Sequence, residues 1–363
     1  MKVKLTEICT PKQWKTIPAN ELLDEGYPVY GANGIIGYYD KYNHENPVVT
    51  ITCRGATCGT VNITEPKSYI TGNAMCLDNV RPDILLEYLY YCLLHYDFSN
   101  VISGSAQPQI TRQGLEKVKI AICSIEEQNK RTSSLRKIST VIAARQQQLQ
   151  KLDELVKARF VEMFGDPQTN PKGYEKRKLG LLAKKISDGV HAKPEYTETG
   201  RPFLSVVNIN KGIINFEGCK FVSEEAYQKM IKSTHPESGD VLYTKVGATY
   251  GIPAYVDTDT EFCLYVSVCL IKPKHDEIDS RFLALSMSMP YIKRQADSRI
   301  KGIGVPDLHL NQISEFDILC PPREEQELFV AFVEQVDKSK VAIQKALDEA
   351  QLLFDSLMQK YFG

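Results

Sequence analysis

Residues 124–165 read SIEEQNKRTSSLRKISTVIAARQQQLQKLDELVKARFVEMFG, and residues 322–363 read PREEQELFVAFVEQVDKSKVAIQKALDEAQLLFDSLMQKYFG. Both stretches carry Glu-Glu-Gln near the start and Phe-Gly at the end. The copies are separated by 198 residues at each end (326 − 128 and 363 − 165). A long stretch repeated at a constant offset indicates that a whole structural unit has been duplicated within the chain.

Each stretch also carries a ladder of residues, mostly apolar, at alternating steps of four and three, the spacing of a helix that packs against another helix. Every position of the ladder in the first stretch maps onto one in the second at the same offset. We therefore predict that the two helices pair with each other along this seam. The predicted seam residues are Leu135, Ile138, Ile142, Leu149, Leu152 and Val156 in the first stretch, and Val333, Val336, Ile343, Leu347, Phe354 and Leu357 in the second.

Neither stretch contains an internal proline or glycine, so each is predicted to be one helix of about forty residues, roughly 60 Å long. Ser124 and Glu127 fit a capping box at the start of the first helix, and Pro321 and Pro322 precede the second. Because the first helix joins the two globular segments, matching seams meet only if the second helix runs back antiparallel to it. A solvent-exposed helix and a coiled coil between molecules remain the alternatives.

The globular segments repeat as well. Residues 55–59 read Gly-Ala-Thr-Cys-Gly and residues 247–251 read Gly-Ala-Thr-Tyr-Gly, each between β-prone runs and 192 residues apart (247 − 55). By Pro108 and Pro306 the offset has become 198, as a loop insertion would produce. We predict an α+β fold with two β-rich domains in a tandem pseudo-twofold repeat, separated by two long antiparallel helices that form a coiled coil. The predicted divisions are 1–123 for the first domain, 124–165 for the first helix, 166–321 for a connector and the second domain, and 322–363 for the second helix.

Composition limits the class of protein. The 363 residues carry a net charge of −1, which argues against binding nucleic acid alone through a broad basic surface. No run of eighteen apolar residues exists and the N-terminal residues lack an apolar signal core, so we expect a cytoplasmic protein that does not enter a membrane. The ten cysteines are scattered without C-x-x-C spacing, and from this spacing we expect no metal site.

In their order along the chain, these motifs resemble the specificity (S) subunit of type I restriction–modification systems. The resemblance rests on residues 27–37, which read YPVYGANGIIG, on the later YITGN at 69–73, and on the twin Gly-Ala-Thr-x-Gly turns. The Glu-Glu-Gln helices that end in Phe-Gly, and Asp-Gly-Val-His at 188–191, add to it. The similarity extends over essentially the whole chain.

This resemblance implies that each globular segment is a target recognition domain reading a few base pairs of double-stranded DNA. It implies that the helices set the distance between two half-sites and dock two methyltransferase (M) subunits. Restriction (R) subunits, which are motor nucleases, would join for cleavage. The chain itself would need no cofactor, because S-adenosylmethionine, ATP and magnesium would belong to those partners.

No motif of an enzyme is found. Cys320-Pro321-Pro322-Arg323 is the nearest string to the Asn/Asp-Pro-Pro-aromatic signature of adenine methyltransferases, and it lacks both the amide or acid and the aromatic residue. There is no phosphate-binding loop and no nucleophile elbow. We therefore predict a non-catalytic DNA-recognition subunit. Two alternatives stay open: a coiled-coil scaffold whose β domains bind protein, and a defence-system nuclease whose carboxylate site is assembled from scattered residues.

DNA contacts require side chains that reach phosphates or base edges from loops, namely Lys, Arg, Asn, Gln, Ser, Thr and Tyr. At the glycine turns the backbone can also approach a phosphate closely. Lys245 aligns with Cys53 rather than with Arg54, so the two turns do not present the same cation. The predicted DNA-binding residues are Asn33, Lys41, Arg54, Thr57, Ser103, Gln107, Gln109 and Arg112 in the first domain, and Lys193, Asn208, Asn210, Lys245, Thr249, Tyr250, Arg299 and Lys301 in the second.

Overall fold

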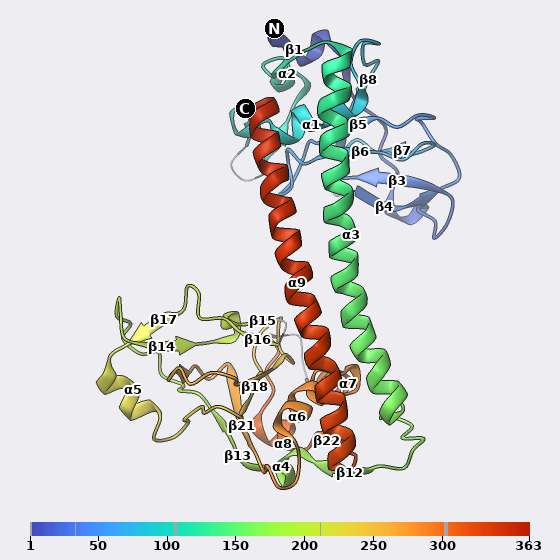
Figure 1. Ribbon diagram of the computed structural model, residues 1–363. Coiled ribbons are helices and arrows are strands. Elements are labelled where there is room, and N and C mark those ends of the chain that lie inside the picture. Colours follow the sequence, from blue (N-terminus) through green and yellow to red (C-terminus); the bar gives the residue numbers. More distant parts are fainter. Residues whose placement is uncertain (1, 33, 105–106, 211, 301–303) are drawn as a thin grey trace. The chain divides into compact units, whose positions relative to one another are not determined.

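The computed structural model describes residues 2–32, 34–104, 107–210, 212–300 and 304–363. The chain divides into two compact units: unit 1 is Met1–Gln148 with Ile343–Gly363, and unit 2 is Leu149–Ala342. Each unit combines small β-sheets with a part of both long helices, so the predicted α+β class is confirmed (Figure 1). Within the described ranges, no helix is both long and apolar enough to cross a membrane.

Unit 1 contains a four-stranded sheet in the order β2-β8-β5-β6 and a three-stranded sheet in the order β4-β3-β7. Two further strand pairs, β1-β11 and β9-β10, complete its β structure. The strands are β1 Lys2–Lys4, β2 Thr10–Gln13, β3 Tyr27–Gly31, β4 Gly34–Tyr39, β5 Val49–Thr52, β6 Val61–Ile63, β7 Tyr69–Ile70, β8 Ala74–Asp78, β9 Ile102–Ser103, β10 Gln109–Ile110 and β11 Lys119–Ala121. The short helices are α1 Leu86–His95 and α2 Arg112–Leu115, with 3-10 turns at Leu5–Glu7, Ala19–Glu21 and Phe98–Asn100.

Unit 2 contains a four-stranded sheet in the order β13-β21-β18-β19, a three-stranded sheet in the order β17-β14-β20, and the pairs β12-β22 and β15-β16. The strands are β12 Glu175–Lys178, β13 Ala183–Asp188, β14 Arg201–Leu204, β15 Ile209–Asn210, β16 Ile213–Ile214, β17 Lys220–Val222, β18 Val241–Thr244, β19 Pro253–Tyr255, β20 Cys263–Leu264, β21 Val268–Pro273 and β22 Asp317–Cys320. The short helices are α4 Leu179–Leu182, α5 Glu224–Met230, α6 Ser280–Met287, α7 Pro290–Arg299 and α8 Leu310–Ser314, with a 3-10 turn at Val206–Asn208.

The two units share one topology, which confirms the predicted tandem repeat. In both four-stranded sheets the third strand in the order, β5 or β18, is buried along its whole length. In both three-stranded sheets one neighbour of the central strand is antiparallel and the other parallel: β3 pairs with β4 and β7, and β14 pairs with β17 and β20. Runs of Val, Thr, Ile and Leu form these central strands because branched side chains pack well on a pleated, buried surface.

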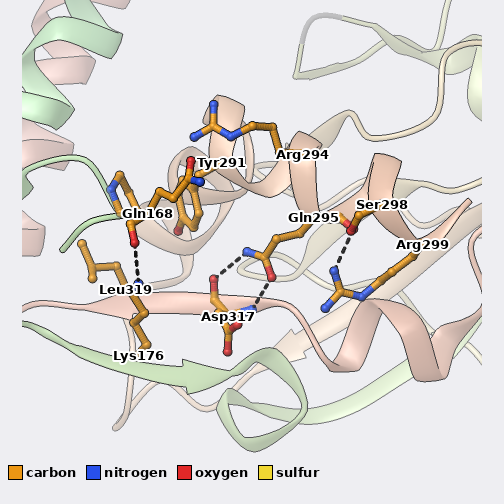
Figure 2. Close-up of a pocket in the computed structure, with 10 residues that line it drawn as sticks. Gln168, Lys176, Tyr291, Arg294, Gln295, Ser298, Arg299, Asp317 and Leu319 are labelled. Carbon is orange, nitrogen blue, oxygen red and sulfur yellow. Dashed lines mark hydrogen bonds between the residues drawn. The ribbon is translucent and has the colours of Figure 1, made fainter.

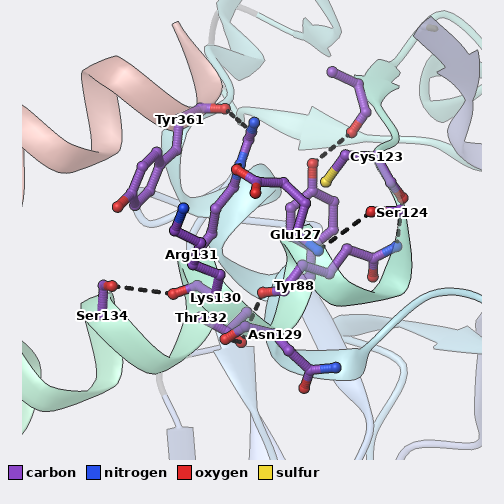
Figure 3. Close-up of polar contacts among 12 residues, drawn as sticks. Tyr88, Cys123, Ser124, Glu127, Asn129, Lys130, Arg131, Thr132, Ser134 and Tyr361 are labelled. Carbon is purple, nitrogen blue, oxygen red and sulfur yellow. Dashed lines mark hydrogen bonds and ion pairs between the residues drawn. The ribbon is translucent and has the colours of Figure 1, made fainter.

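The long helices are α3, Ile125–Phe164, and α9, Arg323–Phe362, each one residue shorter at both ends than predicted. At the start of α3 the capping box is only half formed. The hydroxyl of Ser124 accepts a hydrogen bond from the Glu127 backbone N–H at 3.3 Å, whereas the Glu127 carboxylate pairs with Arg131 at 2.9 Å (Figure 3). The ion pair one turn along the helix therefore replaces the second bond of the box.

Within unit 1, the first part of α3 packs antiparallel on the last part of α9. Leu135 is fully buried against Met358 and Tyr91. One turn earlier in α3, the Arg131 guanidinium donates a hydrogen bond to the Tyr361 backbone oxygen at 2.6 Å (Figure 3). Earlier residues of α3 thus meet later residues of α9, as an antiparallel pair requires.

Within unit 2, the last part of α3 packs antiparallel on the first part of α9. Phe160 and Phe329 lie in the main core of the unit, with ring centroids 5.5 Å apart. Lys340 stands at the ladder position equivalent to Ile142 (142 + 198 = 340), and its ammonium pairs with Asp153 at 2.7 Å across the two helices, so the charge is compensated there. The predicted antiparallel coiled coil is confirmed.

The predicted seam residues are all withdrawn from solvent. Leu135, Val156, Val333 and Val336 are buried, and Ile138, Ile142, Leu149, Leu152, Ile343, Leu347, Phe354 and Leu357 are half-buried. The ladder omitted three apolar residues that the structure buries, Phe160, Phe164 and Met358. These lie where the helices enter the globular parts of the units, so that more than one stripe of each helix is covered.

Candidate nucleic-acid interface

The first Gly-Ala-Thr-x-Gly turn joins β5 to β6 in unit 1. Gly55 and Gly59 have φ of +88° and +97°, a conformation that a residue with a Cβ rarely adopts. The Gly59 N–H closes the turn onto the Thr52 oxygen at 2.9 Å, and the Gly55 N–H ties it to the Pro108 oxygen at 3.1 Å. A Cβ at Gly55 would meet only open space, so this glycine serves the backbone angle and leaves the tip accessible.

The second turn, between β18 and β19 in unit 2, has the same hydrogen bonds. Gly247 and Gly251 have φ of +91° and +92°. The Gly251 N–H bonds to the Thr244 oxygen at 2.8 Å, and the Gly247 N–H bonds to the Pro306 oxygen at 2.9 Å. The duplicated turn is therefore one scaffold used twice, held in each unit by a proline-bearing segment.

In unit 1 this scaffold gathers polar side chains. Arg54 forms a β-bridge with Gln109, and Gln109 pairs with Ser103 across β9 and β10. All three side chains are exposed, as are those of Gln107 and Arg112 nearby. A guanidinium, an amide and a hydroxyl side by side supply the donors and acceptors that phosphates and base edges require.

The same scaffold in unit 2 carries different chemistry. The residues equivalent to Arg54 and Gln109 are Val246 and Asp307, which form the matching β-bridge. One turn therefore presents a cation and an amide, and the other presents an apolar residue and an acid.

Lys245, predicted to contact DNA, is instead buried, with 3% of its surface exposed. Its ammonium lies 3.3 Å from a carboxylate oxygen of Asp307 and 3.7 Å from one of Asp188. Its backbone has the same bonding pattern as Cys53, which is also buried. Each lies between the end of a strand and the bridge residue, Arg54 or Val246, and successive residues of an extended chain point to opposite faces. The Lys245 side chain thus points inward, where its ion pairs stabilise the segment next to the turn, and it is not placed to contact a phosphate.

Asp188 shares this buried site with Lys245. Burial raises the pKa of the Asp188 carboxyl above its ordinary value, because the charged form loses hydration, while the neighbouring Lys245 ammonium acts in the opposite direction. The His191 ring lies 3.7 Å from the second oxygen of Asp188. The pair is a structural ion pair at the edge of the four-stranded sheet.

Asn208 is a second correction, because it too is buried. Its side-chain oxygen accepts a hydrogen bond from the Ser205 N–H at 3.0 Å, and its amide donates to the Asn215 oxygen at 3.2 Å. Both ends of the side chain are used to shape the loop that follows β14, so it is not presented to a ligand.

The remaining predicted DNA-binding residues are distributed over both units. Lys41, Lys193 and Thr249 are exposed and Thr57 is half-buried. The Tyr250 hydroxyl donates to Asp297, and Lys293 lies 4.0 Å from the centre of the Tyr250 ring. Asn33 and Lys301 lie outside the described residues, and the side chain of Asn210 is not among those described either.

Arg299 lines a pocket of about 410 Å³ in unit 2 that also contains Lys176 and Arg294 (Figure 2). The Arg299 guanidinium donates to the backbone oxygens of Gln295 and Glu315 at 2.7 and 3.1 Å. Arg294 keeps a largely exposed side chain, 4.0 Å from Asp166. Sequence reasoning did not single out Lys176 and Arg294, because the cations come from separate segments that only folding brings together.

Comparison with known proteins identifies relatives of the whole arrangement. The family model described as "Type I restriction modification DNA specificity domain" matches residues 1–154 and 171–351. The chain is 24% identical over 284 residues to the type I restriction enzyme MjaVIII specificity subunit of Methanocaldococcus jannaschii, covering 71% of this chain and 67% of that protein. It is 30% identical over 129 residues to the EcoprrI specificity subunit of Escherichia coli, covering 34% and 32%.

The fold is also similar to a solved structure. The S subunit of a type I restriction–modification system from M. genitalium superposes with a TM-score of 0.64 at 16% sequence identity, covering 100% of this chain and 96% of that one. At this level of identity the likeness concerns the fold, and it extends over both units and both long helices.

Proposed function

This chain belongs to the family of the type I restriction modification DNA specificity domain and is a non-catalytic subunit that recognises DNA sequence, and we propose that its two units read the two halves of a bipartite target. The proposed recognition domains are residues 1–123 and 166–321. A type I complex uses such a subunit to direct methylation and cleavage, so the target is double-stranded DNA.

The contrast between the two turns supports this proposal. One scaffold, closed by the same backbone hydrogen bonds, carries Arg54 and Gln109 in unit 1 but Val246 and Asp307 in unit 2. A shared frame with divergent side chains suits two readers of different sequences. In unit 1 the proposed contacts are Lys41, Arg54, Thr57, Ser103, Gln107, Gln109 and Arg112. In unit 2 they are Lys193, Thr249, Tyr250 and Arg299.

We further propose that α3 and α9 set the distance between half-sites and dock two M subunits. Apolar side chains on the helices that face away from the seam support docking. Leu155 in unit 2 and Leu353 in unit 1 occupy equivalent positions of the repeat (353 − 155 = 198), and 46% and 51% of their surfaces are exposed. Two equivalent apolar positions suit two copies of one partner. R subunits, S-adenosylmethionine, ATP and magnesium would enter with the partners, in the cytoplasm.

The test is to express the chain with the M subunit of its own system and map every methylated site in the host DNA. We expect one bipartite sequence with a fixed gap. Methylation at sites with no common bipartite sequence would refute the proposal. DNA binding by the complex should also weaken steeply with salt, because Lys and Arg release counterions from phosphates.

Arg54→Gln tests the assignment of unit 1. If Arg54 reads a base, the substitution relaxes one position of one half-site, at a cost of about 1–3 kcal/mol in discrimination. If it contacts a phosphate, affinity falls for all sequences and the salt slope drops by about 0.9. The matched control is Val246→Ala at the equivalent position of unit 2, which should leave that half-site unchanged. An Arg54 variant with unaltered motif, affinity and salt slope would remove the turn from the interface.

A further inference from the structure

A second polar cluster in unit 1 takes no part in the proposed interface. It lies where the segment between β4 and β5 meets β8. Asn43 fixes this segment: its side-chain amide donates to the Ile70 oxygen at 3.0 Å, and its side-chain oxygen accepts from the Ile70 N–H at 2.9 Å. These two backbone bonds determine which end of the Asn43 amide is oxygen.

The orientation of Asn43 determines the tautomer of His44. The Nδ1 atom of His44 lies 2.7 Å from the Asn43 side-chain oxygen, which can only accept, so Nδ1 carries the hydrogen. A neutral His44 ring therefore has its lone pair on Nε2. That atom lies 3.0 Å from Oδ1 of Asp78, while Oδ2 of Asp78 accepts from the Trp14 indole N–H at 3.2 Å. Two lone pairs thus face each other, and the arrangement calls for a cation between them.

Cys76 supplies a third donor at the same place. It stands two residues before Asp78 on β8, so both side chains leave the same face of the strand. The ligand atoms of His44, Cys76 and Asp78 all lie within 4.8 Å of one another. His44 and Asp78 also line a pocket of about 810 Å³, which opens the cluster to water.

We propose that His44, Cys76 and Asp78 bind Zn²⁺, with a water molecule from the pocket as the fourth ligand. One nitrogen, one sulfur and one oxygen donor form a set that zinc accepts in tetrahedral geometry and that magnesium and calcium do not favour. On binding, the Cys76 thiol gives its proton to water and the sulfur becomes the ligand. The expectation of no metal site, drawn from cysteine spacing, misses this set because its members come from two segments.

The surroundings match those of a metal site. A metal-binding histidine usually donates its other N–H to an oxygen, as His44 does to Asn43, and a metal-binding carboxylate usually accepts a further hydrogen bond, as Asp78 does from Trp14. Zinc here would fasten the segment that carries His44 to the four-stranded sheet.

The repeat provides an internal comparison. β8 and β21 occupy the same place in the two sheets, and the residues equivalent to Cys76 and Asp78 are Leu270 and Lys272. Lys272 pairs instead with Glu237 and Asp240. Unit 2 therefore lacks two of the three donors, and the proposed site belongs to unit 1 alone.

The test uses the full chain, stripped with a chelator and titrated with Zn²⁺ against a chromophoric competitor. We expect one zinc ion per chain, and a thiolate-to-metal charge-transfer band when Co²⁺ replaces Zn²⁺. Cys76→Ser, His44→Gln and Asp78→Asn should each weaken binding at least tenfold. Trp14→Phe, which removes the hydrogen bond to Asp78 and shrinks the ring that packs edge-on against His44, should weaken it by about 10–100-fold. The matched control is Cys92→Ser, a buried cysteine elsewhere in unit 1, which should bind as the wild type does.

Melting curves of the metal-free variants separate loss of binding from loss of folding, and Asp78→Asn, which keeps the side-chain shape, is the decisive variant if the others unfold. A chain that binds no zinc, or a Cys76→Ser variant that binds it equally well, would overturn the proposal. So would nitrogen NMR that shows both ring nitrogens of His44 protonated in the presence of Zn²⁺, because the cation facing Asp78 would then be a proton.

Discussion

The side-chain oxygen of Gln128 lies 2.9 Å from the backbone nitrogen of Leu85 and accepts its hydrogen bond. The amide nitrogen of the same side chain donates to the backbone oxygens of Asp83 and Cys123 at 2.9 and 3.0 Å. Leu85 is the residue before α1, so one fully buried side chain joins the first turn of α3 to the start of a shorter helix.

Gln326, the third residue of the second Glu-Glu-Gln, does the same in unit 2. Its side-chain oxygen accepts from the N–H of Asp279, the residue before α6, at 2.9 Å, and its amide donates to the Pro321 oxygen at 2.8 Å. The repeated glutamine is thus explained by packing: it satisfies backbone groups that the junction of two helices leaves without partners.

Replacing Gln128 with Leu should therefore destabilise unit 1. The substitution removes the hydrogen-bond partner of the Leu85 N–H and of the Asp83 and Cys123 carbonyls, at a cost on the order of 1–3 kcal/mol in the free energy of unfolding. Urea unfolding measures the cost, and hydrogen exchange of the Leu85 amide reports it locally. Gln146→Leu, on the exposed face of α3, is the control and should change stability by less than about 0.5 kcal/mol. Undiminished protection of the Leu85 amide in the Gln128 variant would contradict the prediction.

Leu135 anchors the helix pair of unit 1. It is completely buried against Met358 and Tyr91, and its truncation to Ala should cost about 2–5 kcal/mol through lost burial and a cavity. Val141→Ala, at an exposed position of the same helix, is the matched control. Chemical denaturation of the two variants provides the comparison, and equal midpoints would show that the seam contributes little to unit 1.

The bounds of the two long helices could be predicted from the sequence because they depend on local features of each stretch. A stretch free of proline and glycine, with a constant offset and a four–three ladder, is enough to predict α3 and α9 to within one residue at each end. Phe160 and Phe164 lie off the ladder, because their partners Phe282 and Phe329 come from distant parts of the chain. How deeply a residue at a helix end is buried depends on tertiary contacts, and the spacing of apolar residues within the helix does not predict it.

Lys245 shows the same limit for side chains of the candidate interface. The sequence offset aligns it with Cys53, but its partners Asp188 and Asp307, which hold it in a buried position, lie far from it in sequence. Lys245→Met should destabilise unit 2 by about 3 kcal/mol, because it leaves the buried carboxylate of Asp188 without its cation. The salt slope of DNA binding, measured on the folded fraction, should stay unchanged. If the salt slope instead fell by about 0.9, as expected for one lost phosphate contact, Lys245 would be a DNA-contacting residue.

The stability of unit 2 depends on pH through Tyr174, which lies after the connector between α3 and β12. Its hydroxyl donates to the Glu325 carboxylate at 2.6 Å, and this bond, followed by burial, raises the pKa of Tyr174 from about 10 to about 12. A tyrosine whose pKa is raised on folding contributes stability that is fully present below the unfolded pKa, near 10, and is lost as pH rises through about 12. Tyr174→Phe should therefore cost about 1 kcal/mol at neutral pH, a value reduced for partial exposure.

The measurement is the free energy of unfolding of wild type and Tyr174→Phe at several pH values. Their difference should be constant up to about pH 10 and then shrink. Glu325→Gln, which keeps an acceptor but removes its charge, should show a weaker dependence in the same range. A difference between wild type and Tyr174→Phe that grows with rising pH would show that the sign is wrong.

The proposed spacing role of the helices predicts the effect of lengthening them. One heptad inserted between Gln148 and Leu149 and one between Ala342 and Ile343 keeps the ladder in phase in both helices. Seven residues add about 10 Å, which corresponds to about three base pairs of duplex. Mapping methylated sites should then show both half-sites unchanged and the gap longer by about three base pairs. Affinity should fall, because three base pairs turn the far half-site by roughly 100° around the duplex, and the DNA must twist to present it.

A heptad inserted in α3 alone is the control, since it leaves the seams unequal and should abolish specific methylation. If the doubly lengthened chain methylates the original target with its original gap, the helices do not set the spacing.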